Sequence, residues 1–153
     1  VTNTPIEILR FYNILATRGD YYQFHVYKDE EDQFKKVVNS FENTLRDSYQ
    51  ISEDYLAIVR EGMIEAASYA GDSKEGGTAY KYFGDFEYKI AAKTGTAEVY
   101  GGKKPHAWFA GYFPVDNPKY SIVVLVENGG FGSDIATPIG RKILDFVTGK
   151  IGK

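Results

Sequence analysis

The residues of this sequence best suited to chemistry are the consecutive Lys93, Thr94, Gly95 and Thr96. An ammonium group beside two hydroxyls can bind a carboxylate through charge-assisted hydrogen bonds. The glycine lets a ligand approach the main chain closely, and the amide of Thr96 is suited to be one donor of an oxyanion hole. The tripeptide Lys-Thr-Gly is short, however, and a surface strand with a solvated lysine remains the alternative to an anion-binding site.

Residue types that bind metals or phosphates give no competing site. The chain has no cysteine, so neither a disulfide nor a thiolate zinc site is expected. His25 and His106 are far apart in the sequence and lack the carboxylate-rich spacing of a metal site. The glycine-rich segment 128–132 lacks the spacing and the following lysine of a phosphate loop, which favours a strand-to-helix turn. We therefore expect neither a metal nor a cofactor.

The bulk composition is that of one globular unit. The chain has 153 residues, of which 43% are hydrophobic and 25% are charged, and this suits a single substantial core. The net charge of −3 gives no reason to expect nucleic acid or an acidic membrane surface as a partner. No apolar run approaches the roughly 20 residues of a membrane span.

The first part of the chain is predicted to be a helix followed by a small hairpin. The helix begins at Pro5, which suits a first helical turn, and ends near Gly19. Alternating apolar residues in 21–28 predict a strand, and the acidic run 29–32 predicts a solvated turn. The segment 33–38 is then expected to return as a second short strand.

Two further helices are predicted from apolar spacing. One runs from Ser52 to Gly71 and is followed by a loop over 71–80, in which Thr78 caps a short turn. The other covers 135–150, with Pro138 in its first turn. Each carries an apolar stripe of the kind that faces a core. The stripes consist of Leu56, Val59, Met63 and Ala67 in the first helix, and of Ile139, Ile143, Phe146 and Val147 in the second.

Three strands are predicted in the second half, over 88–100, 106–114 and 120–127. Their short connections require antiparallel neighbours. The last two are apolar on both faces, which is typical of interior strands covered by helices. The fold class is therefore α+β, with an antiparallel sheet of three strands packed with helices.

This sheet is expected to be incomplete. A sheet with two apolar faces should continue, and the strand 120–127 is too apolar to remain a bare edge. The simplest explanation is that further strands belong to a part of the protein outside this chain. Without them, we expect 120–127 to pair by edge addition with a second copy or with the missing part.

Six sequence blocks, in the same order, resemble the transpeptidase domain of class B penicillin-binding proteins of the elongation type. Six blocks in order are far more specific than one tripeptide. Two of them resemble the helix after that family's second motif and its closing helix. The blocks are TPIEILRFYNILATRG at 4–19, GGTAY at 76–80, AAKTGTAEV at 91–99, HAWFAGYFP at 106–114, YSIVVLVEN at 120–128 and ATPIGRKILDF at 136–146.

Two motifs of that family have no counterpart in the sequence. The family's nucleophile lies in Ser-x-x-Lys and its proton-relay serine in Ser-x-Asn, both upstream of the first block. No serine here has lysine three residues later or asparagine two residues later; the serines are Ser40, Ser48, Ser52, Ser68, Ser73, Ser121 and Ser133. Residues 1–153 thus resemble the C-terminal portion of the domain, without its nucleophile-bearing N-terminal portion. Phe24 stands where related proteins often have proline, so the hairpin aligns less well.

The resemblance implies roles for the strand residues. Lys93 would hold the substrate's terminal carboxylate and set the electric field around the relay serine. The hydroxyls of Thr94 and Thr96 would contact the same carboxylate, and the Thr96 amide would complete the oxyanion hole. Strand alternation places Lys93 and Gly95 on one face and the threonines on the other. All three side chains therefore reach one ligand only if the strand is an edge strand or is twisted.

The implied function is that of a peptidoglycan D,D-transpeptidase at the outer face of the bacterial cytoplasmic membrane. Its partners would be the D-Ala-D-Ala stem peptide, β-lactams that mimic it, and the missing N-terminal portion of the domain. This chain alone is expected to be inactive, because no other group in it is positioned to replace the nucleophile. The alternatives are a β-lactam sensor or class D β-lactamase of the same fold, and a non-catalytic interaction module.

Overall fold

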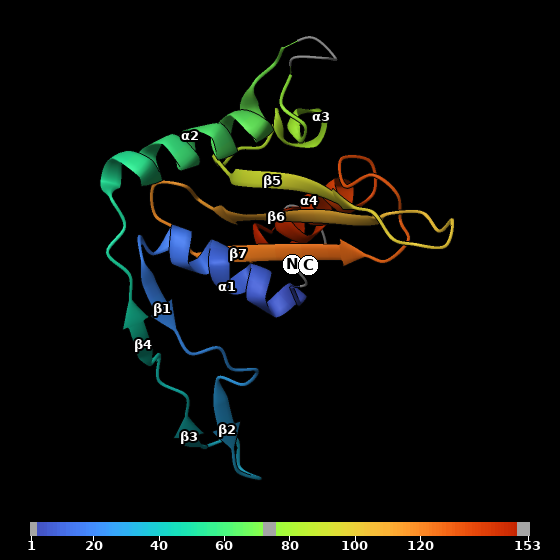
Figure 1. The fold of residues 1–153 in the computed structure, drawn as a ribbon. Coiled ribbons are helices and arrows are strands. Elements are labelled where there is room, and N and C mark those ends of the chain that lie inside the picture. The colour runs from blue at the N-terminus through green and yellow to red at the C-terminus, as the bar shows by residue number, and fades with distance from the viewer. Residues whose placement is uncertain (1–2, 72–75, 150–153) are drawn as a thin grey trace.

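A three-stranded antiparallel sheet lies between helices in the computed structural model, which describes residues 3–71 and 76–149 (Figure 1). Helices α1 and α4 pack on opposite faces of this sheet, whose strand order is β5-β6-β7. The α+β fold class predicted from the sequence is therefore confirmed. The elements are α1 (Pro5–Ala16), β5 (Ala91–Ala97), β6 (His106–Phe113), β7 (Tyr120–Val126) and α4 (Ala136–Val147).

The remaining elements form a side layer and an arm. Helix α2 (Glu53–Ser68) lies beside β5, and the short helix α3 (Tyr80–Phe83) contacts α2 and α4. Between α1 and α2 the chain extends away from the sheet as an arm of two small two-stranded sheets, β1 with β4 and β2 with β3 (Figure 1). Their strands are β1 (Asp20–Tyr22), β2 (Asp29–Glu31), β3 (Val37–Ser40) and β4 (Leu45–Ser48).

The register of the sheet assigns each side chain to a helix layer. Ala110 of β6 pairs with Lys93 of β5 and with Val123 of β7, and this row faces α1. The next row, which includes Phe109 and its partner Val124, faces α4. Because successive strand residues alternate between faces, Lys93 and its neighbour on β5 point to different layers.

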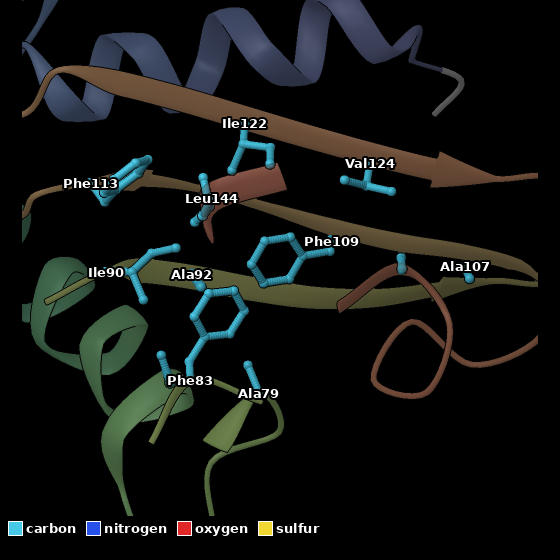
Figure 2. Packing of buried hydrophobic residues seen from close by; sticks show 12 residues of the cluster. Ala79, Phe83, Ile90, Ala92, Ala107, Phe109, Phe113, Ile122, Val124 and Leu144 are labelled. Atoms are coloured by element: carbon cyan, nitrogen blue, oxygen red, sulfur yellow. The ribbon is translucent and has the colours of Figure 1, made fainter. Parts of the chain in front are cut away.

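The main core lies between the sheet and α4 (Figure 2). Phe109 and Phe83 stack with ring centroids 5.3 Å apart, and Leu144 of α4 is 1% exposed against them. Gly140 lets α4 approach this closely, since a Cβ atom there would lie 2.5 Å from the Phe109 ring. This core fixes the position of β6 and, through β6, that of the neighbouring strand β5.

A smaller core lies on the α1 face of the sheet. Tyr12 of α1 packs there with Ala110, Tyr112 and Val115, and Met63 of α2 completes the cluster. The helix α1 begins as predicted: Pro5 opens it, and the Glu7 carboxylate accepts hydrogen bonds from the residue before that proline.

The arm departs from the sequence prediction. The strand expected over 21–28 ends at Tyr22, and Val26 is fully exposed. The acidic run 29–32 was expected to be a turn, but its first three residues form β2 with all side chains exposed. The returning strand was expected over 33–38 and instead runs from Val37 to Ser40, while β4 was not predicted. These strands bury little apolar surface, so the pattern that usually identifies a strand is missing.

Two predicted helix stripes also differ from the structure. In α4 the side facing the core consists of Thr137, Gly140 and Leu144, whereas the stripe that includes Ile139 and Phe146 is exposed. In α2, Leu56, Met63 and Ala67 are buried as predicted but Val59 is exposed. Small residues occupy the α4 contact because the helix axis lies close to Phe109, and a hydrophobicity pattern does not register that closeness. Residues 72–75 of the predicted loop and residue 150 of the predicted helix lie outside the described residues.

Candidate functional site

Strand β5 forms one edge of the sheet, and its exposure changes along its length. Within the described part of the chain it pairs only with β6, and α2 packs beside it. Ala91 and Ala92 are completely buried, whereas Lys93 and Thr96 are exposed. In the described structure β5 is therefore an edge strand. From the sequence, an edge or twisted strand was required if Lys93, Thr94 and Thr96 were to reach one ligand.

A groove of about 540 Å³ lies on the α1 face of the sheet, next to this edge. Lys93 and Gly95 of β5 and Trp108 of β6 line it, and Ile8 and Tyr12 of α1 also contribute to the lining. Gly95 pairs directly with Trp108, and a Cβ atom at Gly95 would be 3.2 Å from the Trp108 Cβ. The glycine therefore keeps the main chain of β5 accessible beside the indole.

Lys93 provides the positive charge of the groove. Its Nζ donates a hydrogen bond to the main-chain oxygen of Thr94 at 2.6 Å, and no ion pair to it is found within residues 3–71 and 76–149. Burial raises the pKa of Tyr12, so its hydroxyl stays protonated at neutral pH. On the α1 side of the groove, the positive charge of Lys93 therefore faces the uncharged side chains of Ile8 and Tyr12.

The two threonines lie on the other face and have different surroundings. The Thr94 hydroxyl is buried and lies 2.9 Å from the hydroxyl of Thr78, with which it shares a hydrogen bond. The Thr96 hydroxyl is exposed and accepts a hydrogen bond of 3.3 Å from the amide of Gly132. Thr78 was predicted to cap a turn, but the N-cap residue of α3 is Ala79.

The glycine-rich segment is the strand-to-helix turn that the sequence predicted, and it supports β5. It connects β7 to α4, and the oxygen of Gly132 accepts hydrogen bonds of 2.9 Å from both the amide and the hydroxyl of Thr137. A Cβ atom at Gly132 would lie 2.1 Å from the Gly95 oxygen and 2.4 Å from the Trp108 oxygen. The loop is thus packed directly against the main chain of the site.

The predicted site residues are therefore only partly brought together. Lys93 and Gly95 share the groove, Thr96 lies at the same edge on the other face, and the Thr94 hydroxyl is held by Thr78. Sequence reasoning placed Thr78 in a turn and gave it no part in the site, because its contact with β5 depends on how the loop returns to the strand.

The two histidines have separate environments. His25 stacks on Phe41 in the arm with ring centroids 3.6 Å apart, and His106 accepts a hydrogen bond from the Asn128 amide at Nδ1. Among residues 3–71 and 76–149, no group of three or more His, Cys, Asp or Glu side chains is placed to hold a metal ion.

The fold and the site together define an α+β protein with an edge strand that exposes Lys93 and Thr96 beside a groove. Comparison with known proteins gives the family: the chain belongs to the penicillin-binding protein transpeptidase domain family, whose model matches residues 1–145. The resemblance seen in six sequence blocks is thereby confirmed.

The relatives are peptidoglycan D,D-transpeptidases. The chain is 32% identical over 162 residues to the peptidoglycan D,D-transpeptidase MrdA of Haemophilus influenzae, covering 95% of this chain and 24% of that protein. Penicillin-binding protein A of M. tuberculosis, solved as an imipenem acyl-enzyme complex, has a TM-score of 0.73 and 25% identity, covering 97% of this chain and 31% of that one. PBP2 of Pseudomonas aeruginosa in complex with WCK 5153 has a TM-score of 0.67 and 29% identity, covering 94% and 29%.

The matches also define how much of a transpeptidase the chain represents. It spans about a quarter of the length of the curated relatives that it matches, so it is a partial transpeptidase domain. None of the described helices is both long and apolar enough to cross a membrane.

Proposed function

We propose that this chain is the C-terminal portion of the transpeptidase domain of a peptidoglycan D,D-transpeptidase, and that it forms the wall of the active site that holds the substrate's terminal carboxylate. The observation that carries the proposal is an edge strand on which Lys93 and Thr96 are exposed beside a groove. Family membership supports it, because the matched relatives are D,D-transpeptidases.

Lys93 and Thr96 have distinct parts in this role. Lys93 provides the positive charge for the carboxylate. Thr96 accepts a hydrogen bond from the Gly132 amide, which occupies one lone pair of its hydroxyl, so its own hydrogen is available for a carboxylate oxygen. Gly95 allows the ligand to approach the strand, and Thr94 lines the groove while its hydroxyl stays paired with Thr78.

The reaction needs a nucleophile from outside this chain. A serine oxygen forms a bond to the carbonyl carbon of the D-Ala-D-Ala peptide bond, and the Thr96 amide stabilises the resulting oxyanion. The carbon–nitrogen bond then breaks, and the departing D-alanine amine takes the serine's proton. An acceptor amine next attacks the acyl-serine ester, so a new peptide bond forms and the serine regains a proton.

Intact-mass spectrometry with benzylpenicillin tests whether the nucleophile comes from outside this chain and the carboxylate-binding wall from within it. The chain alone should gain no adduct, and the nucleophile-bearing portion of the Haemophilus influenzae relative should gain one only when this chain is present. Lys93→Met in this chain should lower the rate of adduct formation at least tenfold, because the β-lactam carboxylate loses its cation. An adduct on this chain alone would contradict the proposal, since a serine within it would then be reactive.

The partners and the location follow from the same proposal. β-Lactam binding is supported by the relative that was solved as an acyl-enzyme complex with imipenem. The stem peptide and the N-terminal portion of the domain are the natural partners of the groove and of the open sheet edge at β7. A cell-wall cross-linking role would place the protein in the bacterial envelope, at the outer face of the cytoplasmic membrane.

A separate observation favours self-association when the N-terminal portion is absent. In the described structure β7 pairs only with β6, and its other edge carries unpaired main-chain groups. Such an edge is a template for a further strand. We therefore propose that isolated copies of this chain pair through β7.

A further inference from the structure

Thr78 lies in a short turn that is fastened to the end of helix α2. The amide of Gly77 donates a hydrogen bond of 2.9 Å to the main-chain oxygen of Tyr69. The amide of Ala79 donates one of 2.8 Å to the oxygen of Ala66, and a Cβ atom at Gly77 would lie 2.6 Å from that same oxygen. Both chain neighbours of Thr78 are thus bound to the main chain of α2 and of its C-cap residue, which restricts where the Thr78 hydroxyl can lie.

Two hydrogen bonds connect this turn to the ammonium group of Lys93. The hydroxyls of Thr78 and Thr94 lie 2.9 Å apart and share the first one. The Lys93 Nζ donates the second, of 2.6 Å, to the main-chain oxygen of Thr94. Thr94 is 8% exposed, so its hydroxyl depends on a partner in the protein. The residue that fixes Thr94 therefore also fixes the acceptor of the Lys93 ammonium group.

We propose that Thr78 is a positioning residue of the carboxylate-binding wall. By pairing with Thr94 it holds the Thr94 main-chain oxygen, and through that oxygen the Lys93 ammonium group, beside the groove. This inference rests on the proposed function, because it takes Lys93 as the carboxylate-binding group. It also changes the task of the Thr94 hydroxyl: the family resemblance implied a contact with the ligand, whereas here the hydroxyl braces the strand.

The strand needs such a brace because of where it lies and what it carries. In the described structure β5 pairs with a strand on one side only, and Thr94 pairs there with Phe109. Lys93 is exposed, and an exposed lysine side chain loses considerable rotamer freedom when its ammonium group is confined. A hydrogen bond to a main-chain oxygen confines the ammonium group only as well as that oxygen is itself held. The pair of threonine hydroxyls supplies this restraint from the side of α2.

The test compares benzylpenicillin with its methyl ester, which keeps the reactive lactam ring but lacks the carboxylate charge. The chain is combined with the nucleophile-bearing portion of the Haemophilus influenzae relative, and intact-mass spectrometry follows the rate of adduct formation. The unmodified chain should favour the acid at least tenfold, and Lys93→Met should abolish this preference. Thr78→Val keeps the side-chain shape but removes the hydroxyl. It should slow the reaction of the acid about two- to tenfold, the range of one neutral hydrogen bond, and leave that of the ester unchanged.

Further variants separate positioning from a merely structural role, in which loss of folded protein would slow the acid and the ester equally. In Lys93→Met, the additional Thr78→Val change should have no further effect on the acid, because the group to be positioned is gone. Thr94→Val should reproduce the loss, and the double variant with Thr78→Val should be no slower than either single one. Thr78→Ser restores the hydroxyl and should keep the preference for the acid.

The matched control is Thr44→Val, which removes a hydroxyl from an exposed position of the arm and should leave both rates unchanged. Urea denaturation establishes that each variant is folded. If Thr78→Val does not fold, Thr94→Val provides the same comparison from the other side of the hydroxyl pair.

The two proposals fail in different ways. Equal rates for acid and ester with the unmodified chain, or no adduct from either, would refute the carboxylate role of Lys93 and this inference with it. A preference for the acid that is lost in Lys93→Met but intact in Thr78→Val and Thr94→Val would refute this inference alone. Equal slowing of acid and ester in Thr78→Val would also overturn it, since Thr78 would then contribute only to folding.

Discussion

Uncharged residues hold the lysine-bearing strand in place. Thr78 anchors the hydroxyl of Thr94 on one side, and the amide of Gly132 anchors that of Thr96 on the other. Neither anchor lines the groove, so both leave the groove side of Lys93 open. The position of Lys93 on the strand thus depends on two neighbouring loops.

Gly132 is the position where this dependence is most easily measured. In Gly132→Ala the new Cβ would lie 2.1 Å from the Gly95 oxygen, which is main chain and cannot rotate away. We expect a loss of about 1–3 kcal/mol in the free energy of unfolding, the usual cost of overpacking. The matched control is Gly62→Ala in α2, where a Cβ meets nothing within 4 Å. There a gain of about 0.5–1 kcal/mol is expected. Urea denaturation measures both changes, and a stabilising Gly132→Ala would contradict the close packing of Gly132 against the Gly95 main chain.

The stability contributed by the start of α1 is expected to depend on pH through the Glu7 carboxylate. The amide and hydroxyl of Thr4 donate hydrogen bonds of 2.6 and 2.9 Å to Glu7, and these lower the pKa of Glu7. A carboxylate with a lowered pKa in the folded state contributes stability above its unfolded pKa, and this is lost as pH falls through the folded pKa. Carbon-detected NMR titration should show the depressed pKa, and Thr4→Ala should bring it part of the way back. An unchanged pKa in Thr4→Ala would exclude a contribution from the hydroxyl.

At the scale of elements, packing strength determines what a sequence pattern can predict. The strands β5, β6 and β7 and the helices α1 and α2 were predicted because they bury regularly spaced apolar residues, whereas α4 was predicted from an apolar stripe that is exposed in the structure. The arm was predicted poorly, since the strand β2 consists of three exposed acidic residues. The same limit applies to the site: alternation assigned Lys93 and Thr96 to their faces. It did not reveal the Thr78 contact or the Gly132 contact, which depend on how two loops return to the strand.

Arg141 connects helix α4 to the segment that precedes β5. Its side chain is 19% exposed and binds both carboxylate oxygens of Asp145 at 3.0 Å. It also donates to the main-chain oxygen of Tyr82 and forms an ion pair of 2.6 Å with Asp85. The guanidinium carbon lies 5.0 Å from the centre of the Phe86 ring. One side chain therefore joins α4 to the turn after α3.

Arg141→Met is expected to lower the free energy of unfolding by about 1–3 kcal/mol, because the partly buried Asp145 carboxylate loses this partner while the apolar stem is kept. The control is Lys142→Met, which removes the same charge from the exposed neighbouring position and should change stability by less than about 0.5 kcal/mol. Thermal or urea denaturation of the two variants measures the contrast. Equal effects would mean that Arg141 contributes only its charge.

At the scale of the whole molecule, apolar surface is left open on one side. The second edge of the sheet, at β7, has no strand partner among the described residues. On α4, the side chains of Ile139, Ile143 and Phe146 are 39%, 42% and 62% exposed. Apolar side chains that are exposed together on one element are typical of interaction surfaces. The chain spans about a quarter of its curated relatives, which agrees with surfaces that are covered in a larger protein.

The open edge at β7 leads to the last prediction, that the isolated chain self-associates. Its sedimentation coefficient should rise with concentration, since pairing of β7 edges satisfies main-chain groups that otherwise face water. Leu125→Lys places a charge on this strand and should shift the population toward monomer, because like charges on paired edges repel. Tyr100→Lys adds the same charge at a fully exposed loop position and should leave association unchanged. A purely monomeric profile at high concentration, or equal behaviour of the two variants, would show that β7 does not mediate association.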